Sequence, residues 1–535
     1  MKAATLHATI LNLDPEWASR TAVKTPKGSL DYAQLREYSL KLACWLADQG
    51  CQRGDRIAVC LPKSIDSVIA QLGSMMAGAA YVPVDPTAPA QRQATIIALA
   101  GAQRILTTPE IGAALRNTGM TLPPLTELTS VGLGEGIASL LQGVSAGVPD
   151  AQVPNSELPV AGQAVGADDL AAILFTSGST GVPKGVSLSH GNILAFVDWT
   201  VATFKFTADD RLTSHAPFHF DLSTMDLYSA FRVGASVFIL DEVLVRFPAS
   251  ISKILATERI TSWYSVPTAL RLLQENGALE RRDLSALRQI FFAGEVFPMP
   301  ALRRVMAAFS GVEFINLYGP TETNVCTYYR LPCIPSEAAL VIPIGIPCEH
   351  YQITIRDEHG KILPAGQSGE IYVAGAGVTL GYWQRADLTE QCRFDGRADS
   401  YRTGDFGCWQ EDGNIRFQGR KDAQIKLRGH RVELLEIENV ILSHPDMKET
   451  AAVLLAPEDE EAVLFACVVP QLGAVVNDAT VYEQCAKFLP HYAEPHEVIV
   501  MADFPRTSTG KIDRQQLRQM CADFMADKAS VKAGA

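Results

Sequence analysis

Hydrophobic residues alternate between two spacings along the first part of the chain. Residues 31–50 place apolar side chains at helical spacing and stop at Gly50, so they predict a helix. RIAVCL at 56–61 then predicts a strand, SIDSVIAQLGSMMAGA at 64–79 a second helix, and AYVPVDP at 80–86 a second strand. This order of strands and helices favours an α/β fold with parallel strands.

The alternation continues to about residue 330, and then the pattern changes. Between 341 and 420, short strand-like segments separated by Gly and Asp turns predict a smaller β-rich subdomain. Residues 423–535 predict a last, α+β unit. Its expected strands lie near 424–428, 451–457 and 462–470, and its expected helices near 434–443 and 478–488. Residues 142–167, rich in Gly, Ala and Pro, predict a long surface loop.

Length and composition narrow the class of protein. A chain of 535 residues is too long for one core, so we expect two or more domains. A net charge of −13 argues against nucleic acid as the main partner, because phosphate backbones select basic surfaces. We find neither a signal peptide nor an apolar stretch long enough to span a membrane. The eleven cysteines form no CxxC pair and the ten histidines no metal-binding pattern, so we expect reduced thiols in a cytoplasmic protein.

Residues 176–185, TSGSTGVPKG, form the most informative stretch. The apolar run before them ends at Phe175 and predicts a buried strand, and the segment after them predicts a strand, a cap at Ser189 or Asn192, and a helix. A loop of hydroxyls, glycine amides and one ammonium can hold phosphate oxygens. It is not a P-loop, because Lys184 is followed by Gly. The alternative is a flexible Ser/Gly linker.

Four further motifs follow in order: NLYGPTET (316–323), YRTGDFG (401–407), GRKDAQIKLRGHRVELLEIE (419–438) and PRTSTGKID (505–513). Together with the first loop they resemble the core motifs of the adenylate-forming superfamily. That superfamily includes acyl-CoA synthetases, luciferases and the adenylation domains of nonribosomal peptide synthetases. The resemblance implies a large N-terminal domain, 1–420, of mixed and mostly parallel sheets flanked by helices with the β-rich subdomain, and a small C-terminal domain.

The family reaction has two halves, and the resemblance assigns residues to the first. A carboxylate attacks the α-phosphate of ATP and releases pyrophosphate, so cations must offset the repulsion between the anions. Lys511 would bridge the two groups, and Glu322 would hold Mg²⁺. The other ATP-binding residues would be Thr176, Ser177, Gly178, Ser179, Thr180, Lys184, Gly294, Glu295, Tyr318, Gly319, Thr321, Asp405 and Arg420.

The resemblance also assigns roles within that set. Thr180 and Lys184 would take the β- and γ-phosphates, Asp405 the two ribose hydroxyls, and Tyr318 would stack on adenine. Taken one at a time, each residue has a simpler interpretation: a solvated lysine, a turn-forming aspartate or a core tyrosine. The prediction therefore depends on their joint occurrence.

In the second half-reaction a thiol attacks the adenylate. The resemblance implies that the C-terminal domain rotates after the first half-reaction and before the second. The hinge would lie at 421–422, on Asp422, ahead of a mobile domain at 423–535. After rotation, Lys426 and Gly429 would replace Lys511 and form the thiol tunnel.

APFHFDLSTMD (216–226) points to the substrate. Asp221 follows an apolar run, so it should lie at the rim of a buried pocket and need a cation, either an amino-acid ammonium or a protein Arg or Lys. The motif alignment adds these lining positions: Leu222, Met225, Tyr264, Phe291, Ala293, Leu317, Val325 and Cys326. Because none is charged, the pocket predicts a small or medium apolar amino acid. The set is similar to that of stand-alone adenylation enzymes for L-proline, the substrate we expect.

Too few residues follow Lys511 for a carrier domain, and no carrier or condensation motif occurs. We therefore expect a free-standing, monomeric ligase that transfers its product to the phosphopantetheine of a separate carrier protein, with coenzyme A as the competing thiol. The alternatives are a D-alanine–carrier-protein ligase, an acyl-CoA synthetase, which Asp221 argues against, and a non-catalytic nucleotide-binding regulator.

Overall fold

The computed structural model of the protein describes residues 5–129, 131–132, 134–142, 165–176, 182–336, 341–420, 424–427, 430–456, 462–506 and 512–533. The chain divides into two compact units, and each is described by itself. The first consists of Met1–Pro86, Gln93–Phe175 and Gly185–Lys421, and the second of Thr87–Arg92, Thr176–Lys184 and Asp422–Ala535. Most of the predicted loop at 142–167 lies outside the described residues.

A large mixed sheet forms one half of the first unit. Among the described residues it has nine strands in the order β15-β14-β13-β12-β11-β9-β10-β1-β2. Their bounds are β1 Thr21–Thr25, β2 Gly28–Asp31, β9 Arg211–Ser214, β10 Ser236–Ile239, β11 Ser262–Ser265, β12 Gln289–Phe292, β13 Glu313–Tyr318, β14 Thr327–Leu331 and β15 Ile346–Pro347. Strands β9 to β13 and β1 pair in parallel, and β2, β14 and β15 add antiparallel edges.

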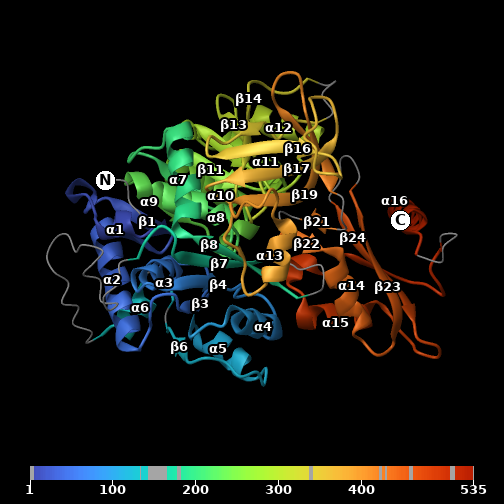
Figure 1. Ribbon diagram of the computed structural model, residues 1–535, viewed down its shortest axis with the longest axis horizontal. Helices are drawn as coiled ribbons and strands as arrows, with labels where there is room; N and C mark the ends of the chain where they lie inside the picture. Colours follow the sequence, from blue (N-terminus) through green and yellow to red (C-terminus); the bar gives the residue numbers. More distant parts are fainter. Residues whose placement is uncertain are drawn as a thin grey trace. The chain divides into compact units, whose positions relative to one another are not determined.

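A second, mostly parallel sheet has seven strands within the described residues, in the order β18-β8-β7-β4-β3-β5-β6. Their bounds are β3 Arg56–Cys60, β4 Ala80–Pro83, β5 Arg104–Thr107, β6 Leu125–Glu127, β7 Leu170–Thr176, β8 Lys184–Ser189 and β18 Gly381–Tyr382. Figure 1 shows β3, β4, β7 and β8 next to one another in this sheet. The strands predicted at 56–61 and 80–86 are confirmed as β3 and β4.

Side-chain caps begin the principal helices. The helix predicted at 31–50 is α2, Tyr32–Asp48, and starts with a reciprocal capping box between Asp31 and Gln34. The helix predicted at 64–79 is α3, Ile65–Met76, capped by Ser64. After β8, Ser189 and Asn192 cap α7, His190–Phe204, as predicted. The other helices of this part of the chain are α1 Ala8–Leu11, α4 Ala90–Ala100, α5 Pro109–Arg116, α6 Glu135–Leu140, α8 Leu222–Thr224, α9 Ala230–Val233, α10 Pro248–Thr257, α11 Pro267–Asn276, α12 Met299–Ala308 and α13 Ala386–Cys392.

A four-stranded antiparallel sheet forms the β-rich part of the first unit. Its strands lie in the order β16-β17-β19-β20, with bounds β16 Tyr351–Arg356, β17 Gly369–Gly375, β19 Ser400–Trp409 and β20 Ile415–Arg420. Alternate residues of β16 are buried, as expected of a sheet with one covered face. The register of β19 and β20 places Asp405 directly opposite Arg420.

The second unit combines a hairpin, a three-stranded sheet and helices. The hairpin pairs β21, Gln424–Leu427, with β22, His430–Glu433. In the sheet, β24, Val463–Pro470, lies between β23, Met447–Leu455, and β25, Glu497–Val500. The helices are α14 Leu434–Leu442, α15 Asp478–Phe488 and α16 Arg514–Ala533. The expected strands and helices of this unit are confirmed, although β23 starts earlier than predicted and α16 was not anticipated.

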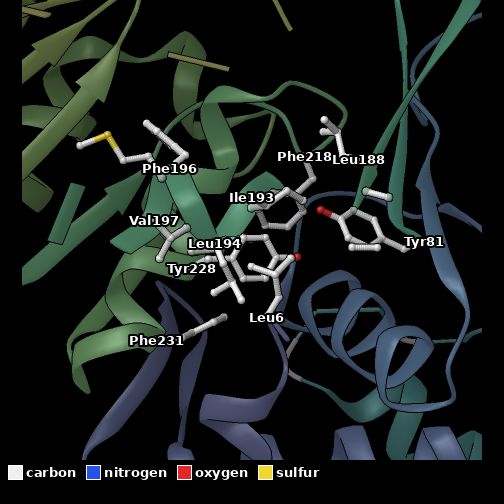
Figure 2. Packing of buried hydrophobic residues seen from close by; sticks show 14 of the residues in the cluster. Leu6, Tyr81, Leu188, Ile193, Leu194, Phe196, Val197, Phe218, Tyr228 and Phe231 are labelled. Carbon is white, nitrogen blue, oxygen red and sulfur yellow. The ribbon is translucent and has the colours of Figure 1, made fainter. Parts of the chain in front are cut away.

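The main apolar core of the first unit gathers side chains from distant segments. Figure 2 shows Leu6 of the N-terminal segment beside residues of α7 and the aromatic rings of Tyr228 and Phe231. The arrangement is the predicted α/β class, with a large N-terminal part of mixed sheets and a smaller C-terminal part. No helix in the described part of the chain combines the length and apolar character needed to cross a membrane.

Candidate active site

Four neighbouring parallel strands of the nine-stranded sheet, β13, β12, β11 and β9, end at the same edge. The segments that follow them contain the candidate residues: 215–226 after β9, 293–295 after β12 and 319–326 after β13. Ligands bind at the carboxyl ends of the strands in open α/β sheets, because loops and helix N-termini meet there. The topology therefore brings together segments that are far apart in the sequence.

Asp405 is the centre of the first polar cluster. It lies on β19, is 3% exposed, and accepts hydrogen bonds from the Tyr318 hydroxyl at 2.6 Å and from Arg420 at 2.6 Å. Burial and the neighbouring Asp405 carboxylate hold the pKa of Tyr318 well above its usual value, so its hydroxyl stays a donor. An ionised carboxylate has about four acceptor positions. Two protein donors therefore leave Asp405 with acceptor capacity for a ligand.

Glu322 forms the second polar cluster, with two tyrosines. Its side chain is fully buried, and Oε1 accepts a 2.6 Å hydrogen bond from the Tyr382 hydroxyl. The hydroxyls of Tyr382 and Tyr401 are 3.0 Å apart. The tyrosines thus orient a carboxylate in the interior. One carboxylate suits Mg²⁺, which keeps several waters and takes its other ligands from substrate phosphates.

The turn that contains Glu322 is fixed by close backbone contacts. A Cβ on Gly319 would lie 1.7 Å from the carbonyl oxygen of Asn324, so only glycine fits there. Asn324 is buried at φ 54°, a left-handed conformation that asparagine tolerates. Its side chain donates to Thr224, which in turn donates to the Asp221 carbonyl at 2.6 Å. Thr321, the remaining predicted residue of this turn, is partly buried.

Gly294 and Glu295 follow β12, one strand away from the Glu322 turn. Gly294 has φ 91°, which makes glycine the favoured residue. The Glu295 carboxylate accepts hydrogen bonds from the amide and the hydroxyl of Thr268, at 3.0 and 2.8 Å. Thr268 lies near the start of α11, where a carboxylate is favourable. The backbone of this turn is therefore held in place by a side chain that the sequence analysis did not single out.

The eight apolar positions predicted to line the substrate pocket converge in one cluster. Seven are buried members of the main core, and Leu222 packs against it. The buried seven are Met225, Tyr264, Phe291, Ala293, Leu317, Val325 and Cys326. Tyr264 and Phe291 are paired across β11 and β12, with ring centroids 6.3 Å apart. The structure thus brings these predicted positions together around the carboxyl ends of the strands.

Asp221 is only partly buried and immediately precedes α8. Burial raises the pKa of Tyr264 well above its usual value, and the negative charge of Asp221 raises it further. The carboxylate is therefore near enough to act on the hydroxyl of Tyr264, one of the predicted pocket residues. It is a negative charge at the edge of an apolar cluster, which is an arrangement that favours a cationic partner.

The phosphate loop and the C-terminal residues are described only in part. Thr176 ends β7 and Lys184 begins β8, and both belong to the second unit. Lys426 lies on β21. Ser177, Gly178, Ser179, Thr180, Asp422, Gly429 and Lys511 lie outside the described residues.

Sequence reasoning missed three side chains that hold the predicted residues in place. Tyr401 begins the motif YRTGDFG, and Tyr382 lies in the segment GEIYVAGAGVTLGYW at 369–383. A tyrosine in an apolar segment gives no sign of its hydrogen-bond partner. Thr268 lies in no motif. Contacts between positions this far apart in sequence become visible only in the fold.

Comparison with known proteins agrees with this arrangement. The sequence profile of the AMP-binding enzymes matches residues 15–383, which is more than half of the chain. The profile of the AMP-binding enzyme C-terminal domain matches residues 436–511.

Two curated relatives are similar over nearly their whole length. An L-proline–[L-prolyl-carrier protein] ligase of Pseudomonas fluorescens is 35% identical over 510 residues, which are 95% of this chain and 98% of that protein. A second protein of the same name, from Streptomyces coelicolor, is 37% identical over 499 residues, 91% of each chain.

Solved structures share the fold. The amide bond synthetase McbA of Marinactinospora thermotolerans superposes with a TM-score of 0.83 at 26% identity, covering 96% of this chain and 99% of that one. The adenylation domain AlmE of Vibrio cholerae, solved with glycyl-adenosine-5′-phosphate, gives a TM-score of 0.80 at 24% identity and covers 98% of both chains. At that identity the second likeness concerns the fold alone.

Proposed function

The chain belongs to the AMP-binding enzymes of the adenylate-forming superfamily, and from this membership we propose that it is a ligase for L-proline. It activates the amino acid with ATP as prolyl-AMP, releases pyrophosphate, and transfers the prolyl group to the phosphopantetheine thiol of a separate carrier protein. The main support for this proposal is the sequence similarity, over nearly the full length, to two proline ligases. The family predicted from the five motifs is confirmed.

The pocket supports a small apolar amino acid. Its predicted walls are Met225, Phe291, Leu317 and other core residues, and none of them is charged. A charged substrate side chain would therefore be buried without a partner, at a free-energy cost of several kcal/mol. Asp221 at the edge of this cluster supplies a negative charge for the α-ammonium. Proline combines a compact apolar ring with a secondary ammonium that has two N–H donors.

The residues around Asp405 and Glu322 would hold the nucleotide and its metal. Asp405 would accept the ribose hydroxyls with the acceptor positions left beyond Tyr318 and Arg420. Glu322 would hold Mg²⁺, which supplies electrostatic stabilisation of the phosphate charge when bound. Thr176, Lys184 and the loop between them would hold the β- and γ-phosphates. Gly294, Glu295, Gly319 and Thr321 would line the adenine and phosphate sites.

The remaining roles belong to the C-terminal domain. Lys511 would offset the repulsion between the proline carboxylate and the α-phosphate. Rotation about Asp422, which joins a 1–420 core to a mobile 423–535 domain, would then bring Lys426 and Gly429 to the thiol. We propose a monomer that acts in the cytoplasm.

The decisive experiment is ATP–pyrophosphate exchange with purified protein across the twenty amino acids, D-alanine, pipecolate and several fatty and aryl acids. We expect exchange with L-proline above all others. Exchange with D-alanine or a fatty acid instead would replace the proposed substrate and keep the adenylation chemistry. Failure to exchange with any acid would support the regulator alternative.

A second measurement identifies the thiol. Radiolabelled proline is supplied with ATP, coenzyme A and a holo carrier protein together. We expect the label in the protein fraction, released by base as a thioester is. Label that stays in the small-molecule fraction would assign coenzyme A as the acceptor. Lys511→Ala should lose exchange while keeping ATP binding, and full activity of this variant would refute the role of Lys511.

A further inference from the structure

A π turn lies beside the proposed amino-acid pocket. The helix that starts after Asp221 runs as α8, then a π turn at Met225–Ser229, and then α9. A π turn within a helix is rare and is found frequently at functional sites. Here it begins at Met225, a predicted pocket residue, and its second residue is Asp226. The irregular turn therefore places an acidic side chain next to the pocket wall.

The Asp226 carboxylate is buried with an open oxygen. Its residue is 2% exposed, and no described residue donates a hydrogen bond to Oδ2. An unsatisfied buried oxygen costs about 1–3 kcal/mol, and more when it is charged. A buried oxygen of this kind needs a partner, which can be a water, an ion or a ligand. Asp226 directly follows the pocket residue Met225 in the π turn, and its charge acts on Tyr264, a second predicted pocket residue.

Lys63 is the buried cation that acts on Asp226. It is 6% exposed, and its Nζ donates to the carbonyl of Ser214, at the end of β9, at 2.7 Å. The ammonium is also 5.1 Å from the ring centroid of Phe218, which Figure 2 shows among the buried side chains with Tyr228 of the π turn. The π turn packs against β9. Lys63 is thus anchored to the strand that supports the turn.

Charged and titratable groups face this pair from several elements. Burial raises the pKa of Asp226 well above its usual value, and Lys63 opposes that shift. Burial lowers the pKa of Lys63 to about 7, while Asp226, Glu242 and Asp241 oppose it. Burial and Lys63 lower the pKa of His215 on the same edge to about 3, so this imidazole stays neutral.

Asp226 acts electrostatically on the hydroxyl of Tyr264, a predicted residue of the substrate pocket. Burial raises its pKa, and the charges of Asp221 and then Asp226 raise it further. Two carboxylates from one helix therefore act on the same hydroxyl of β11. Asp226 therefore acts on a predicted pocket residue, Tyr264, and is itself acted on by the buried cation Lys63.

We propose that Asp226 is a positioning residue that supplies a second negative charge to the substrate ammonium, behind the one that Asp221 supplies directly. This inference rests on the proposed function, since it requires an amino acid in the pocket. Burial favours the protonated form of Asp226, whereas the incoming ammonium, like Lys63, favours its ionised form. The affinity for the cation therefore depends on both carboxylates. Asp226 does not touch the reacting atoms, so it affects binding rather than the chemical step.

The test compares proline with cyclopentanecarboxylate, which has the same ring size and carboxylate and no ammonium. Proline is titrated in pyrophosphate exchange, and cyclopentanecarboxylate is measured as a competitor. We expect Asp226→Asn to raise KM for proline about tenfold, as removal of a nearby charge in a partly buried site does. The KM for ATP and kcat should change less than about twofold, and so should the inhibition constant of cyclopentanecarboxylate.

Asp66→Asn is the matched control. Asp66 is a fully buried carboxylate on α3 that accepts hydrogen bonds from the amides of Gly132, Gly134 and Ile137. Its substitution should lower thermal stability without changing the ratio of the two affinities. If Asp226→Asn weakens both ligands equally, or neither, Asp226 only shapes or supports the pocket and the inference is overturned.

A second variant covers the case in which Asp226→Asn fails to fold. Asp221→Asn leaves Asp226 in place, so this variant should still prefer proline over cyclopentanecarboxylate by about tenfold. Complete loss of the preference would mean that Asp221 alone recognises the ammonium. If the wild type activates another amino acid, the same comparison uses that acid and its desamino analogue, and only the proposed substrate fails. If it activates none, both proposals fall.

Discussion

The orientation of each buried carboxylate in the site is set by the hydrogen-bond donors around it. Asp405 accepts from Tyr318 and Arg420, and Glu322 accepts from Tyr382, although neither set of partners is adjacent in sequence. The motifs predicted the carboxylates because their spacing matches a family. They could not predict Tyr382, because an apolar segment rich in tyrosine is ordinarily core. Hydrogen-bond partners across a fold are set by topology, which local sequence does not specify.

Asp405 leads to a prediction about ribose recognition. If its open acceptor positions take the ribose hydroxyls, the enzyme prefers ATP to 2′-deoxyATP. Asp405→Asn should reduce that preference about tenfold or more, since hydrogen bonds to charged groups contribute about 1.5–3 kcal/mol. The measurement is KM for both nucleotides in pyrophosphate exchange. Tyr318→Phe is the control, because it removes one donor and keeps the carboxylate. An unchanged preference in Asp405→Asn would place the ribose elsewhere.

Glu322 leads to a prediction about metal dependence. Glu322→Gln keeps the size of the side chain and removes the charge that a hard cation prefers. We expect the Mg²⁺ concentration for half-maximal exchange to rise at least about tenfold, the effect of losing more than about 1.4 kcal/mol of binding. Tyr382→Phe, which loses the 2.6 Å hydrogen bond to the carboxylate, should show a smaller rise. Equal Mg²⁺ requirements in wild type and Glu322→Gln would show that the metal is held by other groups.

At the scale of elements, local signals were most reliable where a cap and a periodic pattern agreed. The start of α7 followed from the cap predicted at Ser189 or Asn192, and α2 followed from its apolar spacing, with Asp31 found as its cap in the structure. Helix α16 was missed because its surface is mostly polar: among its residues up to 528, for which burial is described, the buried core members are Leu517 and Cys521, one turn apart. The π turn at Met225–Ser229 was also missed, since no residue pattern distinguishes it from an α-helical turn.

The cap of α7 predicts a local loss of stability. Ser189 accepts from the Asn192 amide at 3.1 Å, so Ser189→Ala should cost about 1 kcal/mol. Asn192 also donates to the carbonyls of Ala376 and Val378, so Asn192→Ala should cost more. Thermal unfolding measures both, with an expected shift of about 2 °C for the first. Ser29→Ala, at an exposed position of β2, is the control. An effect of Ser29→Ala as large as that of Ser189→Ala would contradict the capping argument.

At the scale of the whole molecule, the chain comprises two units with separate cores. The first contains the clusters around Asp405, Glu322 and Asp221, and the second has its own buried apolar groups around β23 and β24. Fold class and family followed from motifs spread over nearly the whole chain. The mechanism proposed for the second unit could not be derived in the same way, because the roles proposed for Lys511 and Asp422 depend on a motion that no local pattern describes. Their roles stay predictions.

The hinge can be tested by separating the two half-reactions. Proline fixes φ near −65°, so Asp422→Pro should restrict the rotation of the C-terminal domain while leaving each unit's core intact. We expect pyrophosphate exchange within about threefold of wild type and transfer of proline to the holo carrier protein reduced at least about thirtyfold, because a hinge that cannot turn blocks only the step after it. Asp422→Ala is the control and should retain both activities, since alanine leaves the backbone free. Equal losses of exchange and transfer in Asp422→Pro would mean that residue 422 supports the fold of the site. Full transfer activity would place the hinge at another residue, or would mean that the thiol reaches the adenylate without a rotation.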